Sequence, residues 1–111
     1  MNLNRRALIR RNDVPAGILL EDDDGYRFSY LDSYLRSPGA KPVSLSLPLA
    51  GENSFCPHLH PFFDGLIPEG WLLEITARTW KLDTRDRMGL LLCCCRDCIG
   101  AVSAEPLEED R

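Results

Sequence analysis

Residues 5–30, RRALIRRNDVPAGILLEDDDGYRFSY, decide the fold that the sequence predicts. They contain three short runs of strand character, at residues 5–11, 14–20 and 26–30. Acidic residues and Gly25 separate the second run from the third, which is typical of a tight turn because glycine adopts a positive φ easily. The third run, YRFSY, alternates aromatic with polar residues like the returning strand of a hairpin. Pro15 and Gly17 indicate that the second strand lies at a sheet edge or contains a bulge.

Beyond the hairpin, the pattern changes from strands to helices. Residues 31–36 suit one helical turn, and apolar residues at every second position of 43–49 predict a half-buried strand. Residues 52–61 are expected to form a loop. Helical segments are predicted at residues 61–66, 69–81 and 84–95, and a last strand at residues 99–105. Thr84 is the expected N-cap of the last helix, with Asp86 in its first turn. This order predicts an α+β fold, a small antiparallel sheet with about three short helices packed on one face.

Length and composition indicate one globular domain. The chain has 111 residues, with 44% hydrophobic and 27% charged residues. We expect residues 1–111 to form a single domain with a flexible tail at 107–111. The net charge of -4 disfavours a general nucleic-acid-binding surface. The longest apolar run, residues 90–95, is too short to span a membrane, and the N-terminal residues do not suit a signal peptide, so we expect a cytoplasmic protein.

The five cysteines are Cys56, Cys93, Cys94, Cys95 and Cys98. Their odd number and the three adjacent members suit no disulfide framework and favour a reducing compartment. Cys95-x-x-Cys98, with Cys56 and His58 upstream, leaves a zinc site or redox sensor as an alternative. We favour cysteines as small apolar residues, since MGLLLCCC continues a helical pattern.

No catalytic arrangement is visible in the sequence. The serines lie in turns or a predicted strand without a nucleophile elbow, and the scattered glycines form no phosphate-binding loop. His58 and His60 lie in a proline-flanked loop, where surface or hydrogen-bonding roles are favoured. The sequence therefore predicts no enzyme and no cofactor.

The helix predicted at residues 69–81 carries both tryptophans of the chain. A helix advances by about 100° per residue, so with Trp71 at zero the apolar side chains cover an arc from roughly 40° to 200°. The members of this arc are Leu72, Leu73, Ile75, Thr76, Thr79 and Trp80. We therefore predict that Trp80 packs in the core and that its loss lowers stability.

Trp71 falls outside this arc, beside Glu74 and Arg78. An exposed indole is unfavourable unless a partner covers it, and tryptophan is enriched at interface hot spots. Alternatively, Trp71 folds back onto a nearby apolar residue: Phe62, Phe63 or Pro68. The pattern alone leaves both interpretations open.

Three sequence blocks resemble a known family: KPVSLSLPL (41–49), PFFDGLIPEG (61–70) and RDCIGAV (96–102). Their order and spacing are similar to those of the N-terminal subdomain of HipA-type serine/threonine kinases, the toxins of HipBA toxin–antitoxin modules. The similarity covers nearly the whole chain. Most such sequences continue into a kinase body, whereas this one stops after the predicted RDCIGAV strand. It therefore looks like a HipS-like stand-alone protein of tripartite HipBST modules. The three cysteines before RDC depart from the family pattern, and their purpose is unexplained.

The resemblance implies an antitoxin that binds and inhibits a HipT-like serine/threonine kinase toxin, while a HipB-like helix-turn-helix protein binds DNA. In that group, a tryptophan just after the Pro-Glu-Gly turn is understood to enter the kinase active site and disturb the nucleotide phosphates. Trp71 is the matching residue here. The predicted partner-binding residues are Pro68, Glu69, Gly70, Trp71, Glu74 and Arg78. A structural subunit that completes the kinase or bridges it to the HipB-like protein, without inhibition, is the alternative.

Overall fold

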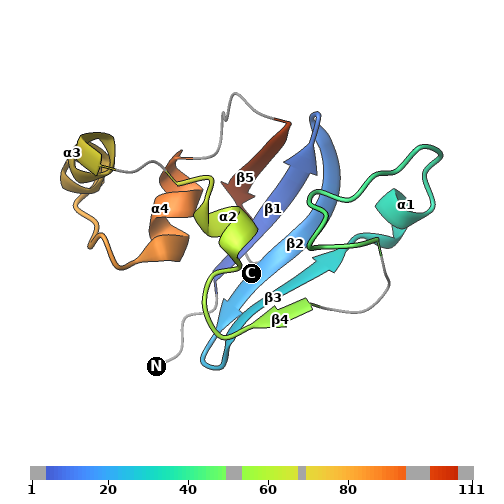
Figure 1. The fold of residues 1–111 in the computed structure, drawn as a ribbon, viewed down its shortest axis with the longest axis horizontal. Helices are drawn as coiled ribbons and strands as arrows, with labels where there is room; N and C mark the ends of the chain where they lie inside the picture. Colours follow the sequence, from blue (N-terminus) through green and yellow to red (C-terminus); the bar gives the residue numbers. More distant parts are fainter. Residues whose placement is uncertain (1–4, 50–53, 68–69, 95–100, 108–111) are drawn as a thin grey trace.

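A computed structural model describes residues 5–49, 54–67, 70–94 and 101–107 of the chain. In these ranges it contains a five-stranded antiparallel sheet of order β4-β3-β2-β1-β5 and four helices (Figure 1). The strands are β1 (Arg5–Arg11), β2 (Val14–Asp22), β3 (Gly25–Tyr30), β4 (Ser54–Cys56) and β5 (Val102–Pro106). The helices are α1 (Asp32–Leu35), α2 (Pro61–Asp64), α3 (Gly70–Trp80) and α4 (Arg87–Cys94). The predicted α+β class is confirmed.

Strand β2 contains the predicted bulge, but it lies inside the sheet rather than at an edge. Ile9 pairs with Gly17 and the next residue, Arg10, pairs with Pro15, so Ala16 is the extra residue of β2. The bulge accommodates a proline in a central strand because its missing N–H falls where the ladder is interrupted. Gly17 is required by close approach, since a Cβ there would lie 2.6 Å from the Phe28 ring. Of the two predicted alternatives, the bulge is therefore confirmed and the edge position is not.

The core lies on one face of the sheet. Alternate strand residues are buried there, and the register aligns them across neighbouring strands: Ala7, Ile9, Leu19, Phe28, Tyr30, Val102 and Ala104. Phe63 of α2 packs on this face, with its ring centroid 5.5 Å from that of Phe28. Helix α4 adds Met88, Leu90 and Leu91, all fully buried. The single-faced core follows from the period-2 alternation of the strands.

Residues 43–49 do not form the predicted strand. Val43 and Leu47 are buried, whereas Leu45 between them is 96% exposed, so the pattern of burial has a period of four. The Tyr30 hydroxyl accepts a hydrogen bond from the Val43 N–H at 3.0 Å and donates one to the Leu47 carbonyl. These bonds and the Leu47 N–H to Ser44 carbonyl bond at 3.0 Å close a turn. A tyrosine distant in sequence thus replaces the strand partner that the alternation suggested.

Strand β4 falls in the segment that was predicted to be a loop. It has three residues, and it pairs at the sheet edge with β3, Tyr26 opposite Cys56. A run this short has no measurable alternation, and Pro57 follows it directly, so pattern alone does not reveal it.

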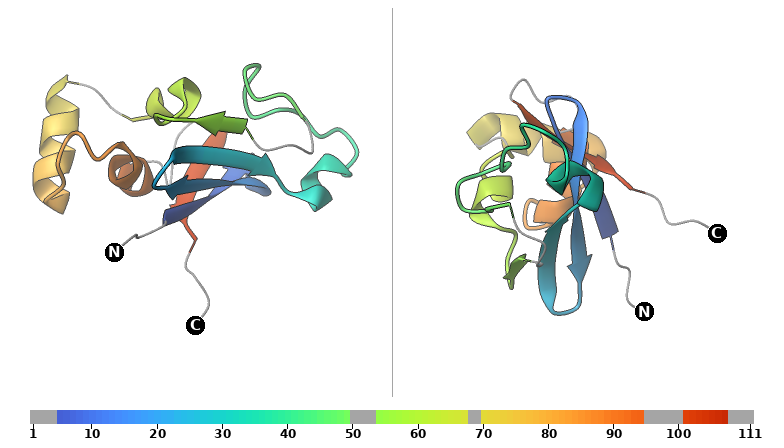
Figure 2. Two further views of the ribbon diagram at one scale, coloured as in Figure 1. Left: turned by 90° about the horizontal axis from the view of Figure 1, so that it is seen from below. Right: turned by 90° about the vertical axis from the view of Figure 1, so that its right-hand side faces the viewer.

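The side of helix α3 that is buried against the rest of the chain differs from the side that the sequence predicted. Trp80 is 60% exposed, and Leu72 and Ile75 are also about half exposed, so the placement of Trp80 in the core is wrong. Ala77 is buried instead and Leu73 is half-buried. Figures 1 and 2 show the physical reason: α3 stands at one end of the molecule with α4 between it and the sheet. A helix with one neighbour buries only a narrow strip of its surface.

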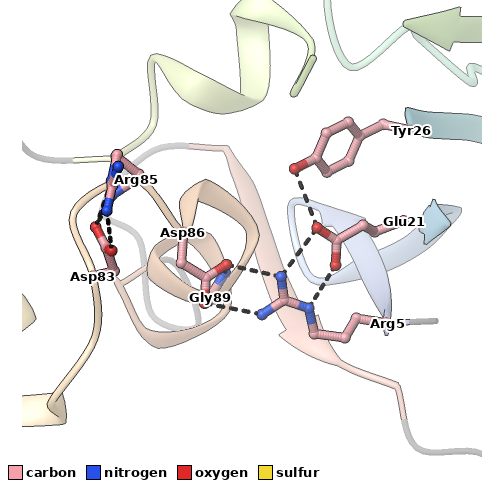
Figure 3. A network of polar contacts seen from close by, with 7 residues as sticks. All are labelled: Arg5, Glu21, Tyr26, Asp83, Arg85, Asp86 and Gly89. Atoms are coloured by element: carbon pink, nitrogen blue, oxygen red, sulfur yellow. Dashed lines mark hydrogen bonds and ion pairs between the residues drawn. The ribbon is translucent and has the colours of Figure 1, made fainter. Parts of the chain in front are cut away.

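Helix α4 begins at Arg87, three residues after the predicted cap Thr84. Asp86 takes the capping position, because its Oδ1 accepts a hydrogen bond from the Gly89 N–H at 3.2 Å. The same carboxylate pairs with Arg5 at the start of β1, at 2.7 Å (Figure 3). Arg5 also pairs with Glu21 of β2 at 2.5 Å. One guanidinium therefore joins the first two strands to the start of α4.

Electrostatics of this cluster follow from the shared guanidinium. The hydrogen bond from Arg5 lowers the pKa of Asp86 below its usual value. The pKa of Tyr26, whose hydroxyl donates to Glu21 at 3.2 Å, is raised to about 12, first by burial and then by the charge of Glu21. Both directions favour the charged ion pair and the neutral phenol near pH 7.

Asp86→Asn is expected to lower the free energy of unfolding at pH 7 by about 1–2 kcal/mol, because a half-buried charge-assisted bond is lost. Since the folded-state pKa of Asp86 is depressed, its contribution is present above the unfolded value of about 3.9 and is lost as pH falls through the folded pKa. Urea unfolding of the wild-type chain and of Asp86→Asn, at pH 7 and near pH 2, measures the difference in their free energies of unfolding. Asp83→Asn, in an exposed pair with Arg85, is the matched control and should change stability less. An equal loss for Asp86→Asn at both pH values would contradict the electrostatic explanation.

Candidate partner-binding site

Four of the six predicted partner-binding residues lie in helix α3: Gly70, Trp71, Glu74 and Arg78. Pro68, Glu69 and the side chain of Trp71 lie outside the described part of the chain. The helix predicted at residues 69–81 is confirmed between residues 70 and 80.

Gly70 opens the helix with a φ of +67°, a left-handed conformation that glycine adopts without strain. No described heavy atom lies within 4 Å of where its Cβ would be. A glycine is thus favoured here by the left-handed backbone conformation, and not by a neighbouring atom that would clash with a Cβ. It sets the entry angle of the chain into α3, and so the orientation of the first helical turn.

Helical register places positions 71, 74 and 78 in one row, because they are separated by three and four residues. Glu74 and Arg78 are both exposed. The buried side of α3, at Leu73 and Ala77, lies roughly 120–160° around the helix from position 71. Positions 71 and 78 therefore lie at least about 100° from the buried residues, whereas Glu74 lies about 60° from Ala77, at the border of the buried side.

Two further side chains border this row, and the sequence interpretation missed them as candidates. Ile75 lies one turn after position 71, and its side chain is 46% exposed. Leu72 directly follows position 71 in sequence, and its side chain is 47% exposed. Their apolar character places them on the predicted core face of the helical wheel. The available signal was width, since an apolar arc of about 160° exceeds the roughly 100° that one packing face needs.

Both histidines take ordinary roles in the described structure. The Nδ1 atom of His60 accepts a hydrogen bond from the Phe62 N–H at 3.1 Å and so caps α2. Partial burial lowers the pKa of His60, which favours the neutral ring that this acceptor role requires. His58 is exposed. The predicted hydrogen-bonding or surface roles are confirmed for these two residues.

Cys56, Cys93 and Cys94 are half-buried. Cys94 packs against the core at the end of α4, as a small apolar residue does. Cys95 and Cys98, the CxxC pair, lie outside the described residues. Within the part of the chain that is described, no three histidine, cysteine or acidic side chains are grouped to hold a metal ion. None of the described helices is long and apolar enough to cross a membrane.

Comparisons with known proteins agree on one family. Residues 7–105 match the family described as the HipA N-terminal domain. A Haemophilus influenzae protein of uncharacterised function is 35% identical over 89 residues, which are 80% of each chain. A solved structure, the N-terminal domain of HipA toxin, is similar with a TM-score of 0.75 and 29% identity over 99% of both chains. The fold and most of the sequence are therefore those of this domain.

Proposed function

Because the chain belongs to the HipA N-terminal domain family, we propose that it is the antitoxin of a HipA-related toxin–antitoxin module, where it binds and inhibits a HipT-like serine/threonine kinase. The observation that carries the proposal is the match over residues 7–105 to a domain named for a toxin. It acts in the cytoplasm by binding, without catalysis of its own. A HipB-like helix-turn-helix protein supplies DNA binding, since this chain has a net charge of -4.

Inhibition is proposed to be steric. A kinase holds nucleotide phosphates, metal ions and the acceptor hydroxyl in one geometry, and its catalysis depends on that positioning. Position 71 lies in the first turn of α3, in one row with the exposed Glu74 and Arg78, and Gly70 sets the direction of that turn. A tryptophan at such a position suits insertion into a partner's cleft and displacement of the phosphates.

Co-expression with the kinase of the same module tests the proposal. The chain is expected to co-purify with the kinase, to restore growth of cells in which the kinase is toxic, and to suppress autophosphorylation of the purified kinase. Unchanged or higher phosphorylation in a stable complex would sink the antitoxin function. That result would favour the alternative of a non-inhibitory structural subunit.

A further inference from the structure

Helix α3 presents an apolar surface that the rest of the chain leaves open. Its members, which we call the α3 stripe, are Leu72, Ile75 and Trp80, with exposed fractions of 47%, 46% and 60%. Leu72 and Ile75 are one turn apart, whereas Trp80 lies two turns beyond Leu72, with Thr76 and Thr79 between them. Single exposed apolar residues are common on protein surfaces, but three on one short helix are typical of an interaction site. The stripe adjoins position 71, because Ile75 follows it by one helical turn.

The α3 stripe is held in a fixed orientation. Ala77 and Leu73 anchor the helix against the body of the molecule. The C-terminal end is closed by a hydrogen bond from the Leu82 N–H to the Ala77 carbonyl at 2.8 Å, with Lys81 at a φ of +56°. This is a Schellman-type end, which satisfies the last carbonyls. A surface ordered before binding loses little conformational entropy when a partner covers it.

Charge indicates the character of the partner. Arg78 and Lys81 are exposed beside the α3 stripe, and neither forms an ion pair with another described residue. The Arg5 and Arg87 side chains, by contrast, are paired with carboxylates of this chain. An apolar recess rimmed by acidic side chains is the complementary surface.

The area of the α3 stripe alone is too small for a stable interface with any partner. A stable interface takes about 800 Å² from each partner, and three half-exposed side chains supply only a fraction of that. A partner that also contacts position 71 and the exposed row of Glu74 and Arg78 buries more of the surface of α3, and its interface can then reach the required area. One kinase can make both contacts, because stripe and row are neighbouring sides of the same helix.

We propose that the α3 stripe is the docking surface for the kinase, which covers it with an apolar recess bordered by carboxylates. This inference rests on the proposed function and deepens it. Docking along the stripe holds α3 in place, and position 71 is then directed at the active site by the rigid helix. The stripe supplies affinity, whereas position 71 supplies inhibition.

The test measures the dissociation constant of the purified chain for a catalytically inactive form of the kinase by calorimetry. Ile75→Glu is expected to weaken binding at least about tenfold, which corresponds to about 1.4 kcal/mol, and Trp80→Ala should also weaken it. Leu45→Glu is the matched control. Leu45 is 96% exposed in the turn of residues 43–49, a segment that lies apart from α3 in Figures 1 and 2, so this change should leave the dissociation constant within about twofold.

Far-UV circular dichroism and the urea midpoint check that each variant is folded, and exposed positions should tolerate these changes. If Ile75→Glu and Trp80→Ala bind like wild type, or if Leu45→Glu weakens binding equally, the inference is wrong. A wild-type dimer that Ile75→Glu converts to a monomer identifies a second copy as the occupant and also overturns it. If the wild-type chain does not bind the kinase at all, the proposed function is wrong as well. If the wild-type chain binds but the stripe variants bind equally well, only the docking surface is wrong.

Discussion

When the kinase is saturated with the Trp71→Ala variant, its phosphorylation rate is expected to be roughly 30- to 1000-fold higher than when it is saturated with the wild-type chain. A buried aromatic anchor contributes about 2–4 kcal/mol at an interface, and here that free energy is used to displace phosphates from their productive geometry. The complex itself should still form, because the α3 stripe is unchanged. Phosphorylation assays at saturating chain concentration, with binding measured in parallel, separate the two effects.

Trp71→Phe is the control for the first prediction. It keeps a large aromatic side chain at the start of α3, so partial inhibition should return. If Trp71→Ala inhibits as strongly as wild type, insertion of this residue is not the mechanism. If the alanine variant loses binding and inhibition together, position 71 is an affinity contact rather than an inhibitory one.

Phe63→Ala is expected to lower the free energy of unfolding by about 3–5 kcal/mol. Phe63 of α2 is fully buried, and its ring contacts those of Phe28 and Phe62 at centroid distances of 5.5 and 5.2 Å. Because domains of this size have about 5–15 kcal/mol of stability, the variant should lose a large part of it. Urea unfolding followed by tryptophan fluorescence or circular dichroism measures the change.

Phe55→Ala is the matched control, because it removes the same ring from an exposed site. Phe55 lies on the edge strand β4, is 51% exposed, and contacts the Arg27 guanidinium, which lies 4.8 Å from the ring centroid. Its loss should lower stability by less than about 1 kcal/mol. Similar losses for the two variants would show that α2 does not anchor the core as its burial indicates.

Local pattern predicted the sheet well where the strands are neighbours in sequence. The hairpin of residues 14–30 is confirmed, because alternation and Gly25 are signals within a few residues of each other. Residues 43–49 show how the same alternation misleads. Their backbone bonds are completed by the hydroxyl of Tyr30, and no window around residue 45 contains that information.

The candidate site divides in the same way. The sequence predicted helix α3, which the structure confirms between residues 70 and 80. The left-handed conformation of Gly70 at the helix start was not predicted. Glu74 and Arg78 are exposed, as their place on the helical wheel indicated. The role of position 71 in a partner's active site stays a prediction. The exposure of Leu72, Ile75 and Trp80 was not predicted, because a helical wheel shows which residues share a side and not what lies opposite that side.

The sequence by itself determined the α+β class, the central hairpin with its bulge, the helical segments and the family resemblance, all of which depend on short-range periodicity or ordered motifs. Only the tertiary structure decided the turn at residues 43–49, the edge strand β4 and which side of α3 is buried. The physical reason is that burial depends on neighbours brought from elsewhere in the chain. Helix α3 has α4 beside it and the sheet beyond, so only a narrow strip at Leu73 and Ala77 is covered, and Leu72, Ile75 and Trp80 stay exposed.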